Sequence, residues 1–366
     1  MIKPVSNQDQ ISKLVIKGFK SIERVDLEMG RLNILIGANG AGKSNLIGFF
    51  RMIQSILDQS LQTYAGRAGG PDAILHFGRK TTPRLEGELY FGNNGYLFTL
   101  EPTSDNRLMF SNEALWWNQY GQYHEGSGHF ETKFNVRGPH GAIWGHVVPA
   151  MRSWRVYHFH DTSSSALVKQ VHGLNDNLFL RDDASNLAAF LLRLQQNFPE
   201  HYVRIVRTIR LVAPFFGDFL LRPGPLNGEK IQLEWTEQGK DVPFTASELS
   251  DGTLRFMCLA TVLLQPDELK PATILIDEPE LGLHPFAVTI LGGLMKSASL
   301  EKQLIVSTQS VELVDEFDVE DLIVVDKRGG ESLFVRPDPK TFAEWLEDYS
   351  LGDLWKKNVF GGRPGR

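Results

Sequence analysis

The stretch Gly37-Ala38-Asn39-Gly40-Ala41-Gly42-Lys43-Ser44 decides the fold. It fits the pattern G-x-x-x-x-G-K-[ST], whose glycines let the backbone wrap around phosphate oxygens. The lysine supplies positive charge to the β- and γ-phosphates, and the serine hydroxyl takes a Mg²⁺ position. Residues 31–36 predict a buried strand and residues 45–53 have helical spacing. We therefore predict a P-loop that binds ATP through Gly37, Asn39, Gly40, Ala41, Gly42, Lys43, Ser44 and Asn45, with Ser44 also binding Mg²⁺.

A second apolar strand ends in two acids, at Thr273-Ile274-Leu275-Ile276-Asp277-Glu278-Pro279. Beside a P-loop strand, Asp277 is predicted to reach Mg²⁺, and Glu278 to orient or deprotonate the attacking water. Asp277 follows Lys43 by 234 residues (277 − 43), which is a far longer interval than in ring-forming AAA+ ATPases, GTPases and small kinases. The guanine-binding pattern Asn-Lys-x-Asp is also absent from the sequence. The long interval predicts an insertion that splits the nucleotide-binding fold into two lobes.

Between these motifs lies Leu249-Ser250-Asp251-Gly252-Thr253, followed by an apolar helical run. A polar residue and a glycine at a helix N-terminus favour anion binding. Here the sequence resembles the ABC-ATPase superfamily, whose signature has the form L-S-G-G-Q. The segment is similar to the variant of this signature that is found in RecF- and SMC-like heads. The resemblance implies that Ser250, Asp251 and Gly252 cap the γ-phosphate bound to a second copy, so that ATP binding produces a homodimer.

Further segments resemble the stand-alone RecF-like and OLD-like AAA members of that superfamily. The acidic strand end continues through Glu280 to Leu283-His284-Pro285. This segment resembles the D-loop of the superfamily, which touches the opposite subunit. Gly18-Phe19-Lys20-Ser21 resembles an early turn that approaches the nucleotide, which implies that Lys20 and Ser21 bind ATP. Gln309 occupies the switch position where many relatives have histidine, and it keeps hydrogen-bonding capacity without the ability to become cationic. We assign Gln309 a catalytic role in slow hydrolysis.

The expected fold class is α/β: an ABC-ATPase head with a P-loop parallel-sheet core, an antiparallel β subdomain and an inserted helical segment. Residues 1–160 are predicted to form the N-lobe, whose aromatic-rich part from residue 85 reads as a meandering antiparallel sheet. Residues 161–245 form the helical insertion, with one helix that Pro199 ends and a second near residues 202–212. Residues 246–340 form the C-lobe with the signature and the acidic strand. Residues 341–366 form a single capping helix and a frayed tail. His158 and His160 are expected on alternate sides of a strand, in structural roles.

The overall composition argues against several classes of protein. There are 38 basic and 44 acidic residues, a net charge of −6 that argues against a constitutive nucleic-acid binder. One cysteine, Cys258, excludes an internal disulfide and is expected to be buried in an apolar run. No stretch is apolar and long enough to span a membrane, so a cytoplasmic protein without a membrane partner is expected.

Two functions from different classes remain open. The first is an ATPase whose ATP-dependent dimerisation controls DNA binding and repair, or a separately encoded effector protein, as in phage-defence ATPases that the family resemblance includes. The second is a nucleotide-gated binding module with slow turnover that scaffolds a partner, which Gln309 favours. An ABC-transporter subunit is disfavoured by the inserted sheet and by the Leu283-His284-Pro285 element.

Overall fold

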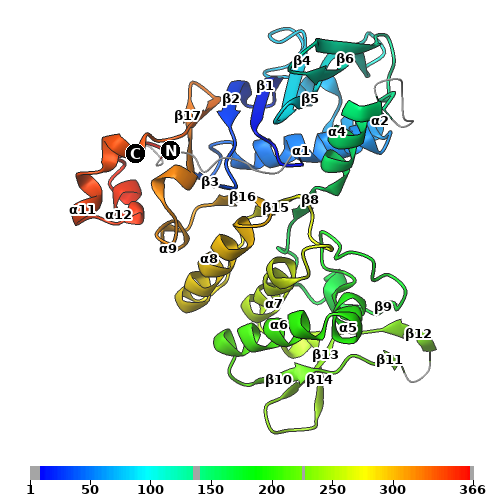
Figure 1. The fold of residues 1–366 in the computed structure, drawn as a ribbon, viewed down its shortest axis with the longest axis vertical. Helices are drawn as coiled ribbons and strands as arrows, with labels where there is room; N and C mark the ends of the chain where they lie inside the picture. Colours follow the sequence, from blue (N-terminus) through cyan, green and yellow to red (C-terminus); the bar gives the residue numbers. More distant parts are fainter. Residues whose placement is uncertain (1–8, 135–140, 225–226, 363–366) are drawn as a thin grey trace. The chain divides into compact units, whose positions relative to one another are not determined.

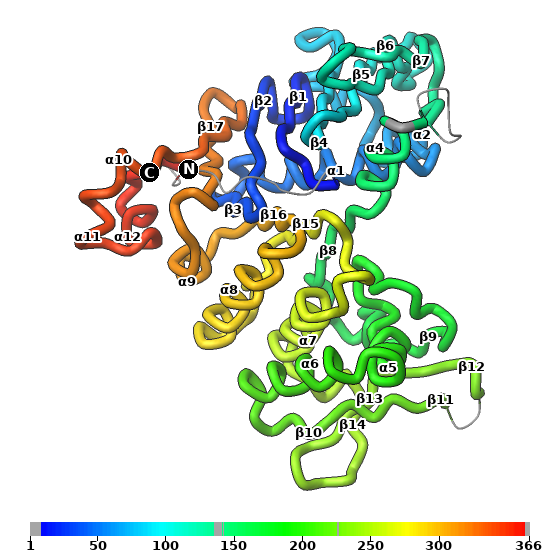
Figure 2. The backbone as a smooth tube through the Cα atoms, in the orientation of Figure 1, coloured from blue at the N-terminus to red at the C-terminus, as the bar shows by residue number. Residues whose placement is uncertain are grey.

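The computed structural model describes residues 9–134, 141–224 and 227–362 and divides the chain into two compact units. Unit 1 comprises residues 1–156, 272–275 and 302–366, and unit 2 comprises residues 157–271 and 276–301. Both units are therefore built from segments that lie far apart in the sequence (Figures 1 and 2).

The P-loop strand lies inside a six-stranded sheet with the order β18-β17-β3-β16-β15-β8. Both neighbours of β3 run parallel to it, as predicted, and β18 pairs with β17 in the antiparallel sense. Every residue of β3 is buried, which explains its continuous apolar run. The strands are β3 (Leu32–Ile36), β8 (Arg155–Tyr157), β15 (Thr273–Asp277), β16 (Gln303–Thr308), β17 (Leu322–Arg328) and β18 (Glu331–Val335).

A second six-stranded sheet, with the order β2-β1-β4-β5-β6-β7, is antiparallel throughout. The antiparallel sheet predicted from residue 85 is confirmed, and two strands from the N-terminal region also belong to it. Phe49 of helix α1 (Lys43–Leu57) contacts Phe19 and Phe98 of this sheet, so α1 packs on it (Figure 1). The strands are β1 (Lys13–Phe19), β2 (Ile22–Glu28), β4 (Leu85–Phe91), β5 (Asn94–Pro102), β6 (Leu108–Trp117) and β7 (Gly121–Gly126), and the short helices α2 (Leu61–Ala68) and α3 (Pro71–Ile74) follow α1.

The sheet expectation was wrong for the end of this region, where α4 (Gly141–Ser153) is a helix that contains Pro149 and carries Trp144.

The insertion in unit 2 was also only partly predicted, because it contains strands as well as helices. Two small antiparallel sheets have the orders β10-β13-β14 and β11-β12-β9. The helix that Pro199 was predicted to end does end just before it, at Asn197, and Pro199 itself begins α6, because its missing N–H is tolerated in the first turn. The helices are α5 (Leu187–Asn197), α6 (Pro199–Val212), α7 (Asp251–Leu264) and α8 (Pro285–Ser299), and the strands are β9 (His172–Gly173), β10 (Phe216–Phe219), β11 (Pro223–Gly224), β12 (Asn227–Ile231), β13 (Glu234–Glu237) and β14 (Pro243–Thr245).

The expected single C-terminal helix is instead three short ones, α10 (Pro339–Phe342), α11 (Trp345–Asp348) and α12 (Leu351–Lys356), after α9 (Val311–Val314). Trp345 and Leu346 are 47% and 38% exposed, so they do not form the buried face that the spacing predicted. Ser350 caps α12 through its side chain, which explains the break before that helix. The expected frayed tail is also wrong up to Gly362, whose carbonyl accepts a hydrogen bond from the Ala38 N–H.

Cys258 is buried in α7, as predicted. Among the residues that the structure describes, no helix is long and apolar enough to cross a membrane.

Candidate functional site

The P-loop of unit 1 connects β3 to α1 through a loop in which three glycines allow a tight turn. Gly42 has φ +117° and precedes the first helical residue, and Gly40 has φ +77°. A Cβ atom on Gly42 would lie 2.0 Å from Ser332 Oγ, and one on Gly37 would lie 2.2 Å from the Val325 carbonyl oxygen. The loop therefore turns tightly onto the N-terminus of a fifteen-residue helix, where backbone N–H groups favour an anion.

Lys43 lies within this turn. Its side chain is 4% exposed, and its ammonium donates hydrogen bonds to the carbonyl oxygens of Gly37 at 2.6 Å and Ala38 at 3.1 Å. The cation is thus held beside the backbone that would surround a phosphate. Ser44 is exposed in the first turn of α1, and Asn45 follows it.

Ser332 of β18 holds the P-loop from outside the motif. Its hydroxyl donates to the Ala41 carbonyl at 2.6 Å and contacts Ser21 Oγ at 2.6 Å, while its N–H donates to the Ser21 carbonyl. Ser21 Oγ also accepts a hydrogen bond from Asn45 Nδ2 of α1. A hydrogen-bonded chain therefore joins Asn45, Ser21 and Ser332 to the loop. Sequence reasoning missed Ser332 because a serine near a hairpin turn carries no motif.

Of the two residues from the early turn, only Ser21 is joined to the P-loop in this way. Lys20 has φ +50°, and its ammonium lies beside Gly48, further along α1 than Lys43. Burial, followed by the nearby charge of Arg51, lowers the pKa of Lys20.

Gln309 lies at the edge of the sheet from which the P-loop emerges. It directly follows β16, whose last residue, Thr308, pairs with Ile36 of the parallel strand β3. The next residue along, Ser310, caps α9 by accepting a hydrogen bond from the Leu313 N–H. The carboxyl ends of β3 and β16 thus place Gln309 at the same sheet edge as Gly37, where ligands of α/β sheets bind.

In unit 2, the acidic pair has an unusual backbone. Asp277 is 7% exposed at the end of β15, and Glu278 has φ +46°. A positive φ at a residue other than glycine is strained, and such strain concentrates at functional sites. Glu278 is one of seven described non-glycine residues with a positive φ, and it is the one that follows the acidic strand β15 directly.

Two histidines accompany Asp277. His160 Nε2 lies 3.1 Å from the Asp277 carbonyl oxygen, and His158 Nδ1 lies 3.7 Å from the Asp277 carboxylate. Their ring centroids are 3.8 Å apart, so the expectation of alternate sides of a strand was wrong. β8 ends at Tyr157, before either histidine, and residues two apart on a strand would in any case share a side.

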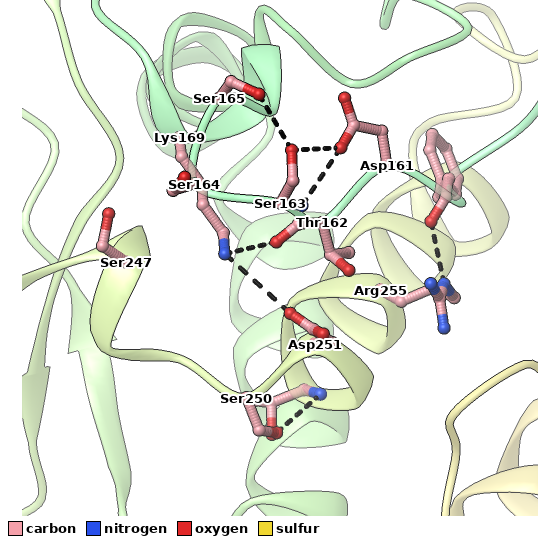
Figure 3. Close-up of polar contacts among 12 residues, drawn as sticks. Asp161, Thr162, Ser163, Ser164, Ser165, Lys169, Ser247, Ser250, Asp251 and Arg255 are labelled. Atoms are coloured by element: carbon pink, nitrogen blue, oxygen red, sulfur yellow. Dashed lines mark hydrogen bonds and ion pairs between the residues drawn. The ribbon is translucent and has the colours of Figure 1, made fainter.

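The signature-like segment forms the N-terminus of α7. Ser250 is exposed and is the N-cap, with its Oγ accepting a hydrogen bond from the Thr253 N–H at 3.2 Å (Figure 3). Asp251 and Gly252 occupy the first turn. Asp161, which lies near this helix, accepts hydrogen bonds from the N–H and hydroxyl of Ser163, and these bonds lower its pKa.

The comparisons with known proteins concern both units. Residues 32–315 match the family described as "AAA domain, putative AbiEii toxin, Type IV TA system". No curated protein matches the chain.

Several solved structures of SMC heads are similar in fold. An SMC head bound to the C-terminal winged-helix domain of ScpA has a TM-score of 0.57 and 20% identity, covering 90% of this chain and 99% of that chain. An SMC head with a coiled coil and joint from Pyrococcus yayanosii has a TM-score of 0.56 and 14% identity, covering 92% and 99%. One with an extended coiled coil from Pyrococcus furiosus, bound to the C-terminal domain of ScpA, has a TM-score of 0.52 and 17% identity, covering 92% and 98%. At these identities the likeness shows the fold alone.

Proposed function

Because the chain belongs to the family described as "AAA domain, putative AbiEii toxin, Type IV TA system" and has the fold of an SMC head, we propose that it is an ATPase that dimerises on binding Mg-ATP. The family match confirms the predicted AAA-type ATPase family, and the likeness to SMC heads confirms the predicted fold class. The observation that carries the proposal is the P-loop turn, in which Lys43 lies against the carbonyls of Gly37 and Ala38 at a helix N-terminus.

In this proposal the P-loop amides and Lys43 bind the phosphates of ATP. The Ser44 hydroxyl and the Asp277 carboxylate are oxygen donors, the type that Mg²⁺ prefers, and we assign the ion to them. The metal would neutralise charge on the phosphates. Glu278 orients the attacking water and takes its proton, and Gln309 contributes a hydrogen bond to the γ-phosphate.

The signature residues supply the second half of the proposal. Ser250 and Asp251 are exposed at the N-terminus of a fourteen-residue helix, where they are accessible to another copy. ATP bound to one copy would be capped by Ser250, Asp251 and Gly252 of the other, so the γ-phosphate drives closure and hydrolysis reopens the dimer. The dimer then acts on DNA or on a separately encoded effector.

The test is the solution mass of Glu278→Gln with and without Mg-ATP, measured by light scattering after gel filtration. We expect the mass to double from 41.2 kDa only when Mg-ATP is present. Adding Ser250→Arg should abolish the dimer while ATP affinity at low protein concentration is retained. Ser247→Arg, at an exposed position before α7, is the matched control and should still dimerise. A mass that does not change with Mg-ATP, or a dimer that still forms in the variant with Ser250→Arg, would refute the proposed role of Ser250 in dimerisation.

Gln309 favours a second candidate, the slow-turnover module that scaffolds a partner. Glutamine at this edge of the P-loop sheet hydrogen-bonds but cannot become cationic. Phosphate release by the wild type and by Glu278→Gln separates the two candidates. Equal background rates would favour the module, and a clear loss in the variant would favour the ATPase.

A further inference from the structure

Arg255 is a buried cation in the second turn of the signature helix α7, and nothing in the proposed chemistry uses it. It is 5% exposed. Its guanidinium donates to three backbone carbonyls: Phe159 at 2.8 Å, His160 at 3.3 Å, and Leu281. One side chain therefore joins α7 to two segments that are far apart in the sequence (Figure 3 shows Arg255 in place). A guanidinium suits this task because its donors form a rigid planar fork.

The first turn of α7 also packs directly on the loop that carries Glu278. A Cβ atom on Gly252 would lie 2.3 Å from the Gly282 carbonyl oxygen. Gly282 itself has φ +76°, and a Cβ there would lie 2.9 Å from Arg255 Nη1. The helix and the loop approach this closely only because both positions are glycine.

A second contact to the segment 159–169 lies on the same face of α7. Asp251, four residues before Arg255, lies 3.9 Å from the ammonium of Lys169, which donates to the Thr162 carbonyl at 2.6 Å (Figure 3). Asp251 is 66% exposed, so we assign this pair little energy by itself. The pair lies at the far end of the segment 159–169, and Arg255 contacts its near end.

These contacts lead directly to the acidic pair. His160 offers its carbonyl to Arg255 and its ring to the Asp277 carbonyl. On the other side, the Leu281 N–H donates to the Glu278 carbonyl, while the Leu281 carbonyl accepts from Arg255. Arg255 thus contacts backbone adjoining the acidic pair on both sides.

We propose that Arg255 is a positioning residue that holds the loop bearing Glu278 against the signature helix, so that the two move as one body. The proposal rests on the function proposed above, in which Glu278 acts on the attacking water. Without the guanidinium, the carbonyls of Phe159 and Leu281 lose a donor, and the strained backbone at Glu278 is free to relax. Hydrolysis should then suffer, while ATP binding by the P-loop of unit 1 should not.

The test compares Arg255→Lys with Arg210→Lys. Arg210 is the matched control because its Nε and Nη2 donate to the Gly217 carbonyl in the same unit, and Gly217 belongs neither to the signature helix nor to the loop that bears Glu278. We expect Arg255→Lys to lower kcat at least tenfold with KM for ATP within twofold, and Arg210→Lys to leave both within twofold. An unchanged kcat in Arg255→Lys would overturn the proposal.

A second readout does not depend on turnover. The Leu283 N–H donates to the Glu280 carbonyl, so hydrogen exchange of the peptide 279–284, measured without added ATP, reports on the loop. Exchange should accelerate in Arg255→Lys and stay unchanged in Arg210→Lys. If the wild type shows no ATP hydrolysis, the proposed function fails, but hydrogen exchange still decides whether Arg255 holds the loop. Equal exchange rates in Arg255→Lys and Arg210→Lys would overturn the proposed role of Arg255.

Should Arg255→Lys fail to fold, Gly252→Ala tests the same interface while keeping the arginine. Its new methyl group must push the Gly282 carbonyl away, so the same acceleration of exchange in the peptide 279–284 is expected. Exchange like that of the wild type in a folded Gly252→Ala protein would contradict the proposed coupling.

Discussion

Ser332→Ala tests whether β18 holds the P-loop in its binding shape. Ser332 is 1% exposed, and its hydroxyl contacts the Ala41 carbonyl and Ser21 Oγ, both at 2.6 Å. Each net hydrogen bond contributes about 0.5–1.5 kcal/mol, and a buried acceptor left without a donor costs about 1–3 kcal/mol. We therefore expect a loss of about 2–3 kcal/mol in the free energy of unfolding. A loosened loop should also raise the Kd for ATP about tenfold, equivalent to about 1.4 kcal/mol.

The assay is urea unfolding followed by tryptophan fluorescence, together with an ATP titration. Ser299→Ala is the matched control, because Ser299 is also buried and donates to a carbonyl, that of Lys296, within its own helix. This control should lose about 1 kcal/mol or less and keep its ATP affinity. Combining Ser332→Ala with Ser21→Ala should give less than the sum of the single losses, because the two hydroxyls contact each other. Additive losses, or an unchanged Kd in Ser332→Ala, would refute the reasoning.

Two further predictions concern Gln309 and Cys258. Gln309→His should preserve or raise phosphate release, because histidine can also become cationic; a collapse of kcat would show that glutamine is required. Burial raises the pKa of the Cys258 thiol from 9.0 to about 12. Above pH 9 the unfolded thiol ionises while the folded one does not, so its contribution to stability falls between pH 9 and about 12, by at most about 1.4 kcal/mol per pH unit. Unfolding of the wild type and Cys258→Ala at pH 8 and pH 11 checks this: the wild type should lose more, and parallel losses would contradict the assigned burial.

Local patterns predicted the parts of the fold that depend on neighbours in sequence. The apolar run before the P-loop became β3, and the apolar run after Ser250 became α7, with Ser250 as its N-cap. The helix α4 was within reach of the same reasoning. Ile143, Val147, Val148 and Met151 recur at helical spacing and are buried, but the aromatic residues and turn signals around them favoured a sheet.

Contacts between distant segments could not be predicted in this way. Ser332 and Gly362 reach the P-loop because β17 lies next to β3 in the sheet and β18 lies next to β17, and no local pattern records that order. The strands β9–β14 are short and lie among strong helical patterns, so composition gave them little weight. Arg255 reads from sequence as one more residue of an apolar helix, and its role depends on carbonyls at Phe159 and Leu281.

The P-loop glycines show what a motif does encode. The pattern fixes Gly37 and Gly42 and leaves the position of Gly40 free. A Cβ on Gly37 would lie 2.2 Å from the Val325 carbonyl oxygen, and one on Gly42 would lie 2.0 Å from Ser332 Oγ. A Cβ on Gly40 would meet no atom within 4 Å beyond its own chain neighbours. Gly40 needs only a positive φ, which asparagine and aspartate also tolerate. The fixed glycines are therefore the positions where another part of the chain touches the loop, so the motif records packing by the hairpin β17–β18 as well as room for a phosphate.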